Sequence, residues 1–227
     1  MLRFENRKTE RYLFKTLPEA LVPIEVTLRG GELTVEAFRR VKSVAKEFYK
    51  KHKNCPFLDE AKIFIDRSLR DIVSKWGYAA CDLNEGHIVT YIANEINREA
   101  IQQSTVKIKS SKGYENLTEY ELEDIAEDSE EYYFVTLAED KIVSVCETNS
   151  EEAFIGAKEI NVYTAPEYRG RGYATSNAAA AAEYYKSIGY KVAYTARADN
   201  HPSLRTAEGC GFTKTAETLY YICYKEL

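Results

Sequence analysis

Glycine, proline and long apolar runs are scarce in this chain of 227 residues. Its 11 glycines and 5 prolines fall below average usage, which is roughly 12% for the two together. This argues against collagen-like, disordered or linker-rich organisation. No apolar run approaches the roughly 20 residues that span a bilayer, and the charged residues 1–7 lack the apolar stretch of a signal peptide. We therefore predict a cytoplasmic globular protein without membrane association.

Cysteine, histidine and excess positive charge are scarce as well. The five cysteines are scattered and form no Cys-x-x-Cys pair, so neither a disulfide framework nor a zinc ribbon is indicated. The three histidines are far apart, which argues against a histidine-built metal site. The formal net charge of −5 argues against general nucleic-acid binding. We predict neither a metal nor a nucleic-acid partner.

The chain does contain enough apolar material for a buried core. Hydrophobic residues make up 44% and charged residues 30%, as in a globular domain. The 18 tyrosines could serve in a core, in an interface or as a proton donor, and composition does not distinguish these roles.

The first third of the chain is predicted to be helical. Behind Thr34, a favourable N-cap, apolar residues recur at helical spacing: Val35, Phe38, Val41, Ala45 and Phe48. A second helix is expected from about Asp59 to Gly77. The apolar spacing of residues 88–101 favours a third helix, although their β-branched segment 88–92 fits a strand equally well. We therefore expect a helical N-terminal region over residues 1–103.

From residue 104 the pattern changes to alternating strands and helices. Period-two alternation predicts a first strand, a later pair of segments predicts a hairpin, and a capping box predicts a short helix within an acidic run. The expected elements are strand 105–110, helix 118–126, hairpin 132–138 with 141–148, strand 153–164, helix 173–188, strand 191–197, helix 202–208 and strand 217–225.

A basic, glycine-containing turn between a predicted strand and a predicted helix is the most informative segment. Gly170 and Gly172 allow close approach of a ligand to the backbone. The turn opens into a helix N-terminus, where backbone amides and the helix dipole favour an anion. Arg169 and Arg171 add positive charge. We expect a phosphate or pyrophosphate here. The alternative interpretation is an ordinary strand–turn–helix whose basic turn binds no ligand.

Two common phosphate-binding loops do not fit this turn. No Gly-x-x-x-x-Gly-Lys-Ser/Thr string is present. A dinucleotide fingerprint needs a small third residue where Thr175 stands. The third pattern, Arg/Gln-x-x-Gly-x-Gly/Ala, is met at every specified position by residues 169–174, Arg-Gly-Arg-Gly-Tyr-Ala. The chain thus resembles the GCN5-related N-acetyltransferase (GNAT) superfamily.

Residues further along strengthen this resemblance. The family places an Asn after the next strand, then a short helix and a Gly-Phe pair, and Asn200, Gly211 and Phe212 stand at those positions. The resemblance covers residues 104–227. It implies an α/β (α+β) fold with a mixed, splayed central sheet flanked by helices, preceded here by the region 1–103.

The resemblance implies an acetyl-CoA site, with acetyl-CoA as co-substrate. The pyrophosphate would be bound by the backbone of Arg169, Gly170, Arg171, Gly172, Tyr173, Ala174 and Thr175. The pantetheine arm would pair with the backbone of Val162, Tyr163 and Thr164, and Asn200 and Ser203 would hold its other side.

The implied reaction is direct attack of an amine on the thioester, without a covalent enzyme intermediate. A backbone N–H near Val162 or Tyr163 would stabilise the oxyanion. Glu159 is the candidate base, with an ordinary strand carboxylate as the alternative. The family often has a tyrosine where Ala207 stands here. Ser203, Tyr220 or Tyr221 could replace that acid, or the reaction could need none. For the two tyrosines, a role as core and surface partners on the last strand is the alternative.

We therefore predict an N-acetyltransferase that uses acetyl-CoA and a primary amine, more readily of a small molecule than of a protein. The acidic run 115–131 could attract a cationic amine or be merely solvated. A non-catalytic acyl-CoA-binding module and a nucleotide-binding regulator remain alternatives. The acceptor, the acyl chain and the choice between monomer and homodimer stay open.

Overall fold

The computed structural model describes residues 1–5, 20–80, 83–109, 115–116, 132–138, 141–148 and 156–225. The predicted helix 118–126 and nearly all of the acidic run lie outside these residues. The chain forms two compact units, of which the first comprises residues 1–89, 197–199 and 215–227 and the second comprises residues 90–196 and 200–214. These units do not coincide with the predicted regions 1–103 and 104–227, since residues 90–103 belong to the second unit and residues 197–199 and 215–227 to the first.

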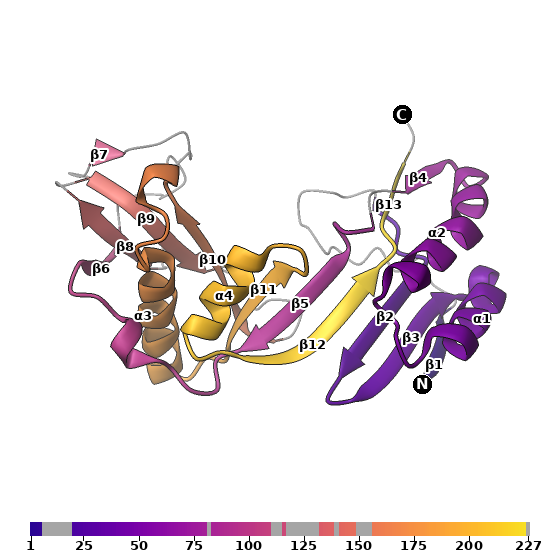
Figure 1. Ribbon diagram of the computed structural model, residues 1–227, viewed down its shortest axis with the longest axis horizontal. Coiled ribbons are helices and arrows are strands. Elements are labelled where there is room, and N and C mark those ends of the chain that lie inside the picture. The colour runs from indigo at the N-terminus through magenta and orange to yellow at the C-terminus, as the bar shows by residue number, and fades with distance from the viewer. Residues whose placement is uncertain are drawn as a thin grey trace. The chain divides into compact units, whose positions relative to one another are not determined.

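The first unit combines a sheet with two helices (Figure 1). Its elements are β1 (Leu2–Glu5), β2 (Ile24–Arg29), β3 (Glu32–Phe38), the 3-10 turn η1 (Arg39–Val41), α1 (Lys42–His52), α2 (Asp59–Ser74), β4 (Tyr78–Ala80), the start of β5 (His87–Ile92), most of β12 (Thr213–Tyr220) and β13 (Cys223–Lys225). The strands are ordered β1-β3-β2-β12, and β4 pairs with β13. Residues 1–103, which were predicted to be a helical region, therefore contain strands as well as helices.

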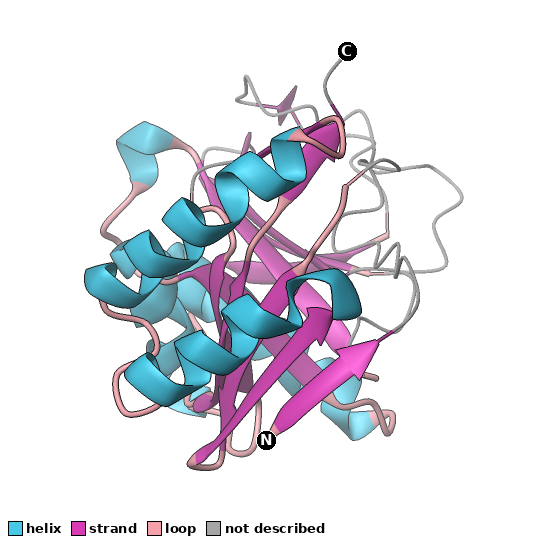
Figure 2. Cartoon of the chain, turned by 90° about the vertical axis from the view of Figure 1, so that its right-hand side faces the viewer, coloured by secondary structure: helices cyan, strands magenta, loops and turns pink. Residues whose placement is uncertain are grey.

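The core of the first unit lies between its helices and its sheet (Figure 2). Val26 of β2 and Val35 of β3 face Phe48 of α1 and Leu69 of α2, and all four are fully buried. The predicted helix 59–77 is confirmed as α2, with a buried residue at each turn. Apolar residues on one helical face gain stability by removal from water, which is why this pattern was readable from the sequence.

The predicted helix start at Thr34 is wrong. Residues 32–38 form β3, where burial alternates with period two, and β3 pairs antiparallel with β2, Val26 opposite Val35. A turn at Gly30 and Gly31, both with positive φ, joins the two strands. Such a two-glycine turn between alternating segments is a hairpin signal. The helix begins only at Lys42, where the pairing has ended.

The second unit contains the predicted alternation of strands and helices (Figure 1). Its further elements are the 3-10 turn η2 (Arg98–Ala100), β6 (Thr105–Ile108), β7 (Glu115–Asn116), β8 (Tyr133–Ala138), β9 (Lys141–Thr148), β10 (Lys158–Thr164), the 3-10 turn η4 (Pro166–Tyr168), α3 (Tyr173–Ser187), β11 (Val192–Arg197) and α4 (His201–Gly209). The strands are ordered β11-β10-β9-β8-β6, with β7 beside β9. Neighbours are antiparallel except for the parallel pairs β10–β11 and β7–β9.

Two further sequence predictions differ from the structure. The helix expected over 88–101 is wrong, because residues 87–92 form β5 and the Ala93 amide donates to the Val192 carbonyl of β11 at 3.0 Å. The β-branched alternative was the right one. The final predicted strand 217–225 is two strands, β12 and β13, separated by residues 221–222. The fold class, mixed α/β with a largely antiparallel sheet flanked by helices, is confirmed.

Helix α3 packs against β8, β9 and β10. Its alanine-rich middle makes this close approach feasible, because small side chains let a helix lie near a sheet; Ala178, Ala179, Ala181 and Ala182 are fully buried. No helix among the described residues is long and apolar enough to cross a membrane.

Candidate acetyl-CoA site

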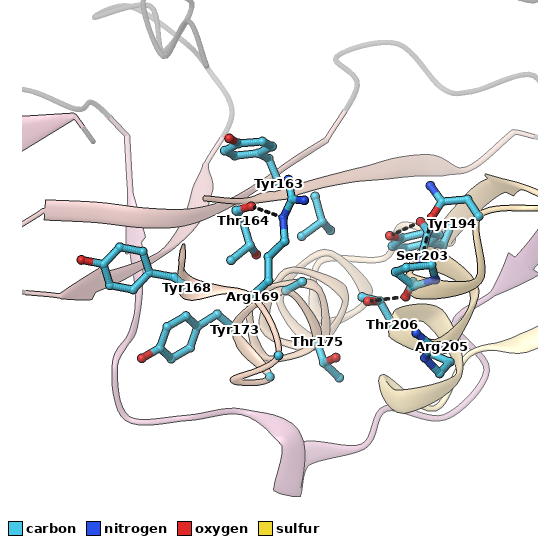
Figure 3. A pocket seen from close by; sticks show the side chains of 16 residues that line it. Tyr163, Thr164, Tyr168, Arg169, Tyr173, Thr175, Tyr194, Ser203, Arg205 and Thr206 are labelled. Carbon is cyan, nitrogen blue, oxygen red and sulfur yellow. Dashed lines mark hydrogen bonds between the residues drawn. The ribbon is translucent and has the colours of Figure 1, made fainter. Parts of the chain in front are cut away.

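A cavity of about 550 Å³ opens in the second unit where β10, the N-terminus of α3 and the start of α4 meet (Figure 3). Its volume falls in the range of roughly 300–1,000 Å³ that is usual for small-molecule sites. Its lining includes every residue predicted to bind the cofactor except Arg171. The lining residues that the sequence did not predict are Tyr168, Tyr194, Pro202, Arg205 and Thr206.

The glycine turn forms one end of this cavity. Gly170 and Gly172 adopt left-handed conformations, with φ of 77° and 81°, which cost other residues about 1–2 kcal/mol. Gly172 is the N-cap of α3, and the first intrahelical bond runs from the Ser176 amide to its carbonyl at 2.9 Å. The amides that precede Ser176 in the first turn of α3 therefore point out of the helix N-terminus, where an anion is favoured.

The two arginines of the turn have different positions. Arg169 lines the cavity, and its Nε donates to the Thr164 carbonyl at 3.0 Å. The Arg171 guanidinium lies 5.0 Å from the centre of the Tyr168 ring and donates to the Glu167 carbonyl. Gln102 Nε2 donates to the Arg171 carbonyl at 2.9 Å and so fixes the turn from outside. Arg169 is thus the arginine placed for a ligand.

Successive residues of β10 direct their main-chain N–H and C=O groups alternately toward β9 and toward β11. The Tyr163 carbonyl accepts a bond from Ser144 of β9 at 2.9 Å, and the Ala165 amide also donates to β9. The Lys158 amide donates in the opposite direction, to the Lys191 carbonyl before β11. Because main-chain direction alternates along a strand, Val162 and Thr164 face the β11 side. The Tyr163 main chain is directed to β9, away from the place predicted for the pantetheine arm.

Strands β10 and β11 are paired only at their beginnings. Their register ends with Ile160 opposite Tyr194, although β10 continues to Thr164 and β11 to Arg197. Val162 and Thr164 lie beyond this last pair and line the cavity. The strands therefore diverge where the cavity begins, as expected for a splayed sheet.

Helix α4 supplies the opposite wall. Asn200 caps it, with its side-chain oxygen accepting from the Ser203 amide at 3.2 Å. Asn is a preferred N-cap because its oxygen satisfies an otherwise unpaired helical amide. The Ser203 hydroxyl is 2.8 Å from the Tyr194 hydroxyl of β11. Asn200 and Ser203, the residues predicted to hold the pantetheine arm, thus both border the cavity.

The structure does not bring all predicted catalytic residues to the cavity. Glu159 is half-buried, accepts a hydrogen bond from Thr195 and is not among the lining residues. Tyr220 belongs to the first unit, where it is 6% exposed and packs with Val22 and Ile222. This burial agrees with the core role considered for it. Of the candidates, Ser203 alone is a lining residue.

Tyr194 is the functional candidate that the sequence missed. It is 4% exposed, and its ring meets Phe212 edge-on at 6.3 Å. Its place in a predicted strand that ends just before the Asn200 cap was a usable signal, because ligands bind at carboxyl ends of strands in α/β sheets. Within the described residues, no group of three or more His, Cys, Asp or Glu side chains could hold a metal ion.

The sequence profile of the acetyltransferase (GNAT) family matches residues 77–212, and this chain belongs to that family. No curated protein matches the chain. Among solved structures, a protein from Novosphingobium aromaticivorans assigned to the GNAT family is 16% identical, with 66% of this chain and 69% of that chain covered and a TM-score of 0.49. Family membership rests on the sequence match.

Two further solved structures are similar to this chain at low identity. A GCN5-related N-acetyltransferase-like protein from Streptococcus suis is 17% identical, with 72% and 68% of the two chains covered and a TM-score of 0.46. An acetyltransferase of the GNAT family from Colwellia psychrerythraea is 14% identical, with 41% of this chain covered and a TM-score of 0.35. This chain spans 34% of the length of the Colwellia protein.

Proposed function

We propose that this protein transfers an acetyl group from acetyl-CoA to a primary amine of a small molecule, by direct attack in a ternary complex. Family membership supports acetyl transfer in general. The observation that carries the cofactor assignment is the cavity at the α3 N-terminus, whose lining nearly coincides with the residues predicted for acetyl-CoA. All elements around it lie within residues 104–227, the segment proposed as the acetyltransferase domain.

The pyrophosphate of acetyl-CoA would lie on the amides from Gly172 to Thr175. These amides precede the first intrahelical bond of α3, so they can donate to phosphate oxygens at no expense to the helix. Arg169, held by its Nε at the Thr164 carbonyl, can direct its remaining N–H groups to the same anion. This arrangement supports a diphosphate as the anchoring group.

The pantetheine arm would run along the β11-facing edge of β10. Val162 and Thr164 present their main chain on this edge, beyond the last pair with β11. An amide-containing arm can pair there as an added strand. Since the Asn200 side-chain oxygen is bonded to the Ser203 amide, its amide nitrogen is the atom that would donate to a pantetheine carbonyl.

The thioester then requires an amine, an oxyanion donor and a proton donor. The Val162 amide is directed to the cavity side and would stabilise the oxyanion, a contribution worth about 2.7–4 kcal/mol in other enzymes. Because Glu159 does not line the cavity, it would receive the amine's proton through a water molecule. The thiolate would take its proton from a hydroxyl group that lines the cavity, where Ser203 is the candidate that the sequence predicted.

One observation favours a second function, a non-catalytic acyl-CoA-binding module. Ala207 occupies the position where the family often has the tyrosine that serves as general acid, and it is fully buried. An alanine offers no proton. Such a module would bind acetyl-CoA at the same cavity without releasing CoA.

Thermal-shift measurements followed by a thiol-release assay test the proposal. We expect acetyl-CoA and CoA to raise the melting temperature, because a ligand that binds only the folded state stabilises it by about 2.7 kcal/mol at 100 times its Kd. ATP and NAD serve as controls that carry a diphosphate without pantetheine. Acetyl-CoA with a panel of primary amines should then release free thiol.

Each outcome points to one function. Stabilisation by ATP or NAD but not by CoA would favour a nucleotide-binding regulator and contradict the proposal. Stabilisation by acetyl-CoA without thiol release from any amine would favour the binding module. Thiol release with a particular amine class would identify the acceptor.

A further inference from the structure

Acetyl transfer to an amine needs a proton at the leaving sulfur, and the cavity offers several hydroxyl groups. Most are engaged or distant from the diverging strands. The Thr164 hydroxyl is 2.8 Å from the Ser144 hydroxyl, and the Thr206 hydroxyl donates to a carbonyl of its own helix at 3.1 Å. Tyr168 and Tyr173 border the glycine turn in Figure 3, whereas Tyr194 lies across the cavity beside α4.

Tyr194 stands at the point where the two strands separate. It is opposite Ile160, the last residue of β10 paired with β11. A cofactor that runs along the free edge of β10 with its diphosphate at α3 would place its acyl end toward this point, because Gly172 and Ile160 lie at opposite ends of the Val162–Thr164 edge. Among the hydroxyl groups compared above, that of Tyr194 is therefore the one placed for the thioester.

The surroundings of Tyr194 keep it protonated and also support it as a donor. Burial raises the pKa of Tyr194 to about 12, whereas the hydrogen bond with Ser203 acts in the opposite direction. Cys146 and Cys210 are the titratable groups that face it. Burial raises the pKa of both thiols, so they are neutral near pH 7. A hydroxyl that donates to the tyrosine oxygen stabilises the tyrosinate form.

We propose that Tyr194 is the catalytic acid of the acetyl transfer and that Ser203 supports it by donating a hydrogen bond to its oxygen. This inference rests on the proposed function. As the tetrahedral intermediate collapses, the carbon–sulfur bond breaks and its electron pair goes to sulfur, which takes the Tyr194 hydroxyl proton. The tyrosinate accepts a hydrogen bond from Ser203 and is then reprotonated by the proton that the attacking amine has released. The balance is amine plus acetyl-CoA to amide plus CoA.

The pKa of the thiol of bound CoA, followed by thiolate absorbance, tests this assignment without an acceptor. A tyrosine that donates to sulfur lowers this pKa below that of free CoA. We expect Tyr194→Phe to raise the pKa of the bound thiol by about one unit and Ser203→Ala to raise it less. With an active amine, Tyr194→Phe should lower kcat about 100-fold, in the range of general-acid effects, while the KM for acetyl-CoA changes less than about threefold.

Tyr185→Phe is the matched control. Tyr185 is also 4% exposed in the second unit, and its hydroxyl bonds to the Tyr132 main chain, outside the cavity. This variant should leave the thiol pKa and kcat unchanged. If Tyr194→Phe and Ser203→Ala bind CoA with an unaltered thiol pKa, the assignment is wrong while the proposed function stands. If the unmodified protein does not bind CoA, both fail.

Discussion

Replacing Gly172 with glutamate is expected to weaken binding of acetyl-CoA at least about 1,000-fold. Gly172 caps α3 at the end of the cavity where the diphosphate is proposed. A carboxylate about 4 Å from a phosphate charge costs about 4 kcal/mol at an effective dielectric constant of 20, which corresponds to that factor. The added side chain would also meet Gln102, whose Nε2 lies 3.0 Å from the position of a Cβ.

The fold should survive this change. The left-handed conformation costs glutamate about 1–2 kcal/mol, and Gln102 is a flexible side chain that can move. Binding is measured by isothermal titration calorimetry with acetyl-CoA, and stability by urea unfolding.

Gly189→Glu is the matched control for Gly172→Glu. Gly189 follows the other end of α3, also has a positive φ, 94°, and has open space around it. Both variants should lose similar stability, but only Gly172→Glu should lose acetyl-CoA. Equal affinity in the two variants would show that the glycine turn does not bind the diphosphate.

Replacing Asn177 with leucine should destabilise the protein by about 3–5 kcal/mol. Asn177 is fully buried in α3. Its oxygen accepts from Thr105 of β6 and Thr136 of β8, both at 2.9 Å, and its nitrogen donates to Ser144 of β9 at 3.1 Å. Leucine has nearly the same size but offers no partner, and each buried polar group left unsatisfied costs about 1–3 kcal/mol.

Asn97→Leu is the matched control for this prediction. Asn97 is exposed and makes one side-chain bond, to the Gly209 carbonyl at 3.0 Å, so its loss should cost less than about 1 kcal/mol because water replaces the partner. Urea unfolding followed by circular dichroism gives both values. A similar small loss in both variants would mean that the buried network adds little stability.

The network around Asn177 also connects α3 to β10, whose edge is proposed for the pantetheine arm. Ser144 receives the Asn177 bond and itself donates to the Tyr163 carbonyl of β10. Ser176, the next residue back in α3, accepts from the Gln102 amide at 2.7 Å. Asn177→Leu should therefore also weaken acetyl-CoA binding in the protein that remains folded, because the spacing between α3 and β10 depends on these bonds.

Elements with strong local patterns were predicted correctly. The hairpin of β8 and β9, the helix α3 behind its glycine turn and the short helix α4 behind Asn200 all appear near their expected bounds. Each depends on alternation, a cap or a turn residue within a few positions. For the same reason the glycine turn pointed to the cavity proposed for acetyl-CoA before any tertiary contact was known.

The errors arose where one stretch fits two periodicities. Val35, Phe38 and Val41 have helical spacing, yet Val35 is held in β3 between β1 and β2. Residues 88–92 were assigned by four-residue spacing although their β-branched side chains suit a strand. In both cases pairing with a strand distant in the sequence outweighed a weak local helix preference.

From the sequence alone came the GNAT resemblance, the glycine turn of residues 169–174 as a candidate phosphate site and the mixed α/β class, because these follow from short-range patterns. The tertiary structure alone decided that the Tyr163 main chain faces β9, that Glu159 and Tyr220 do not line the cavity, and that Tyr194 meets Ser203 there. Strand register and side-chain direction set these contacts, and both depend on pairing between separate elements rather than on neighbouring residues.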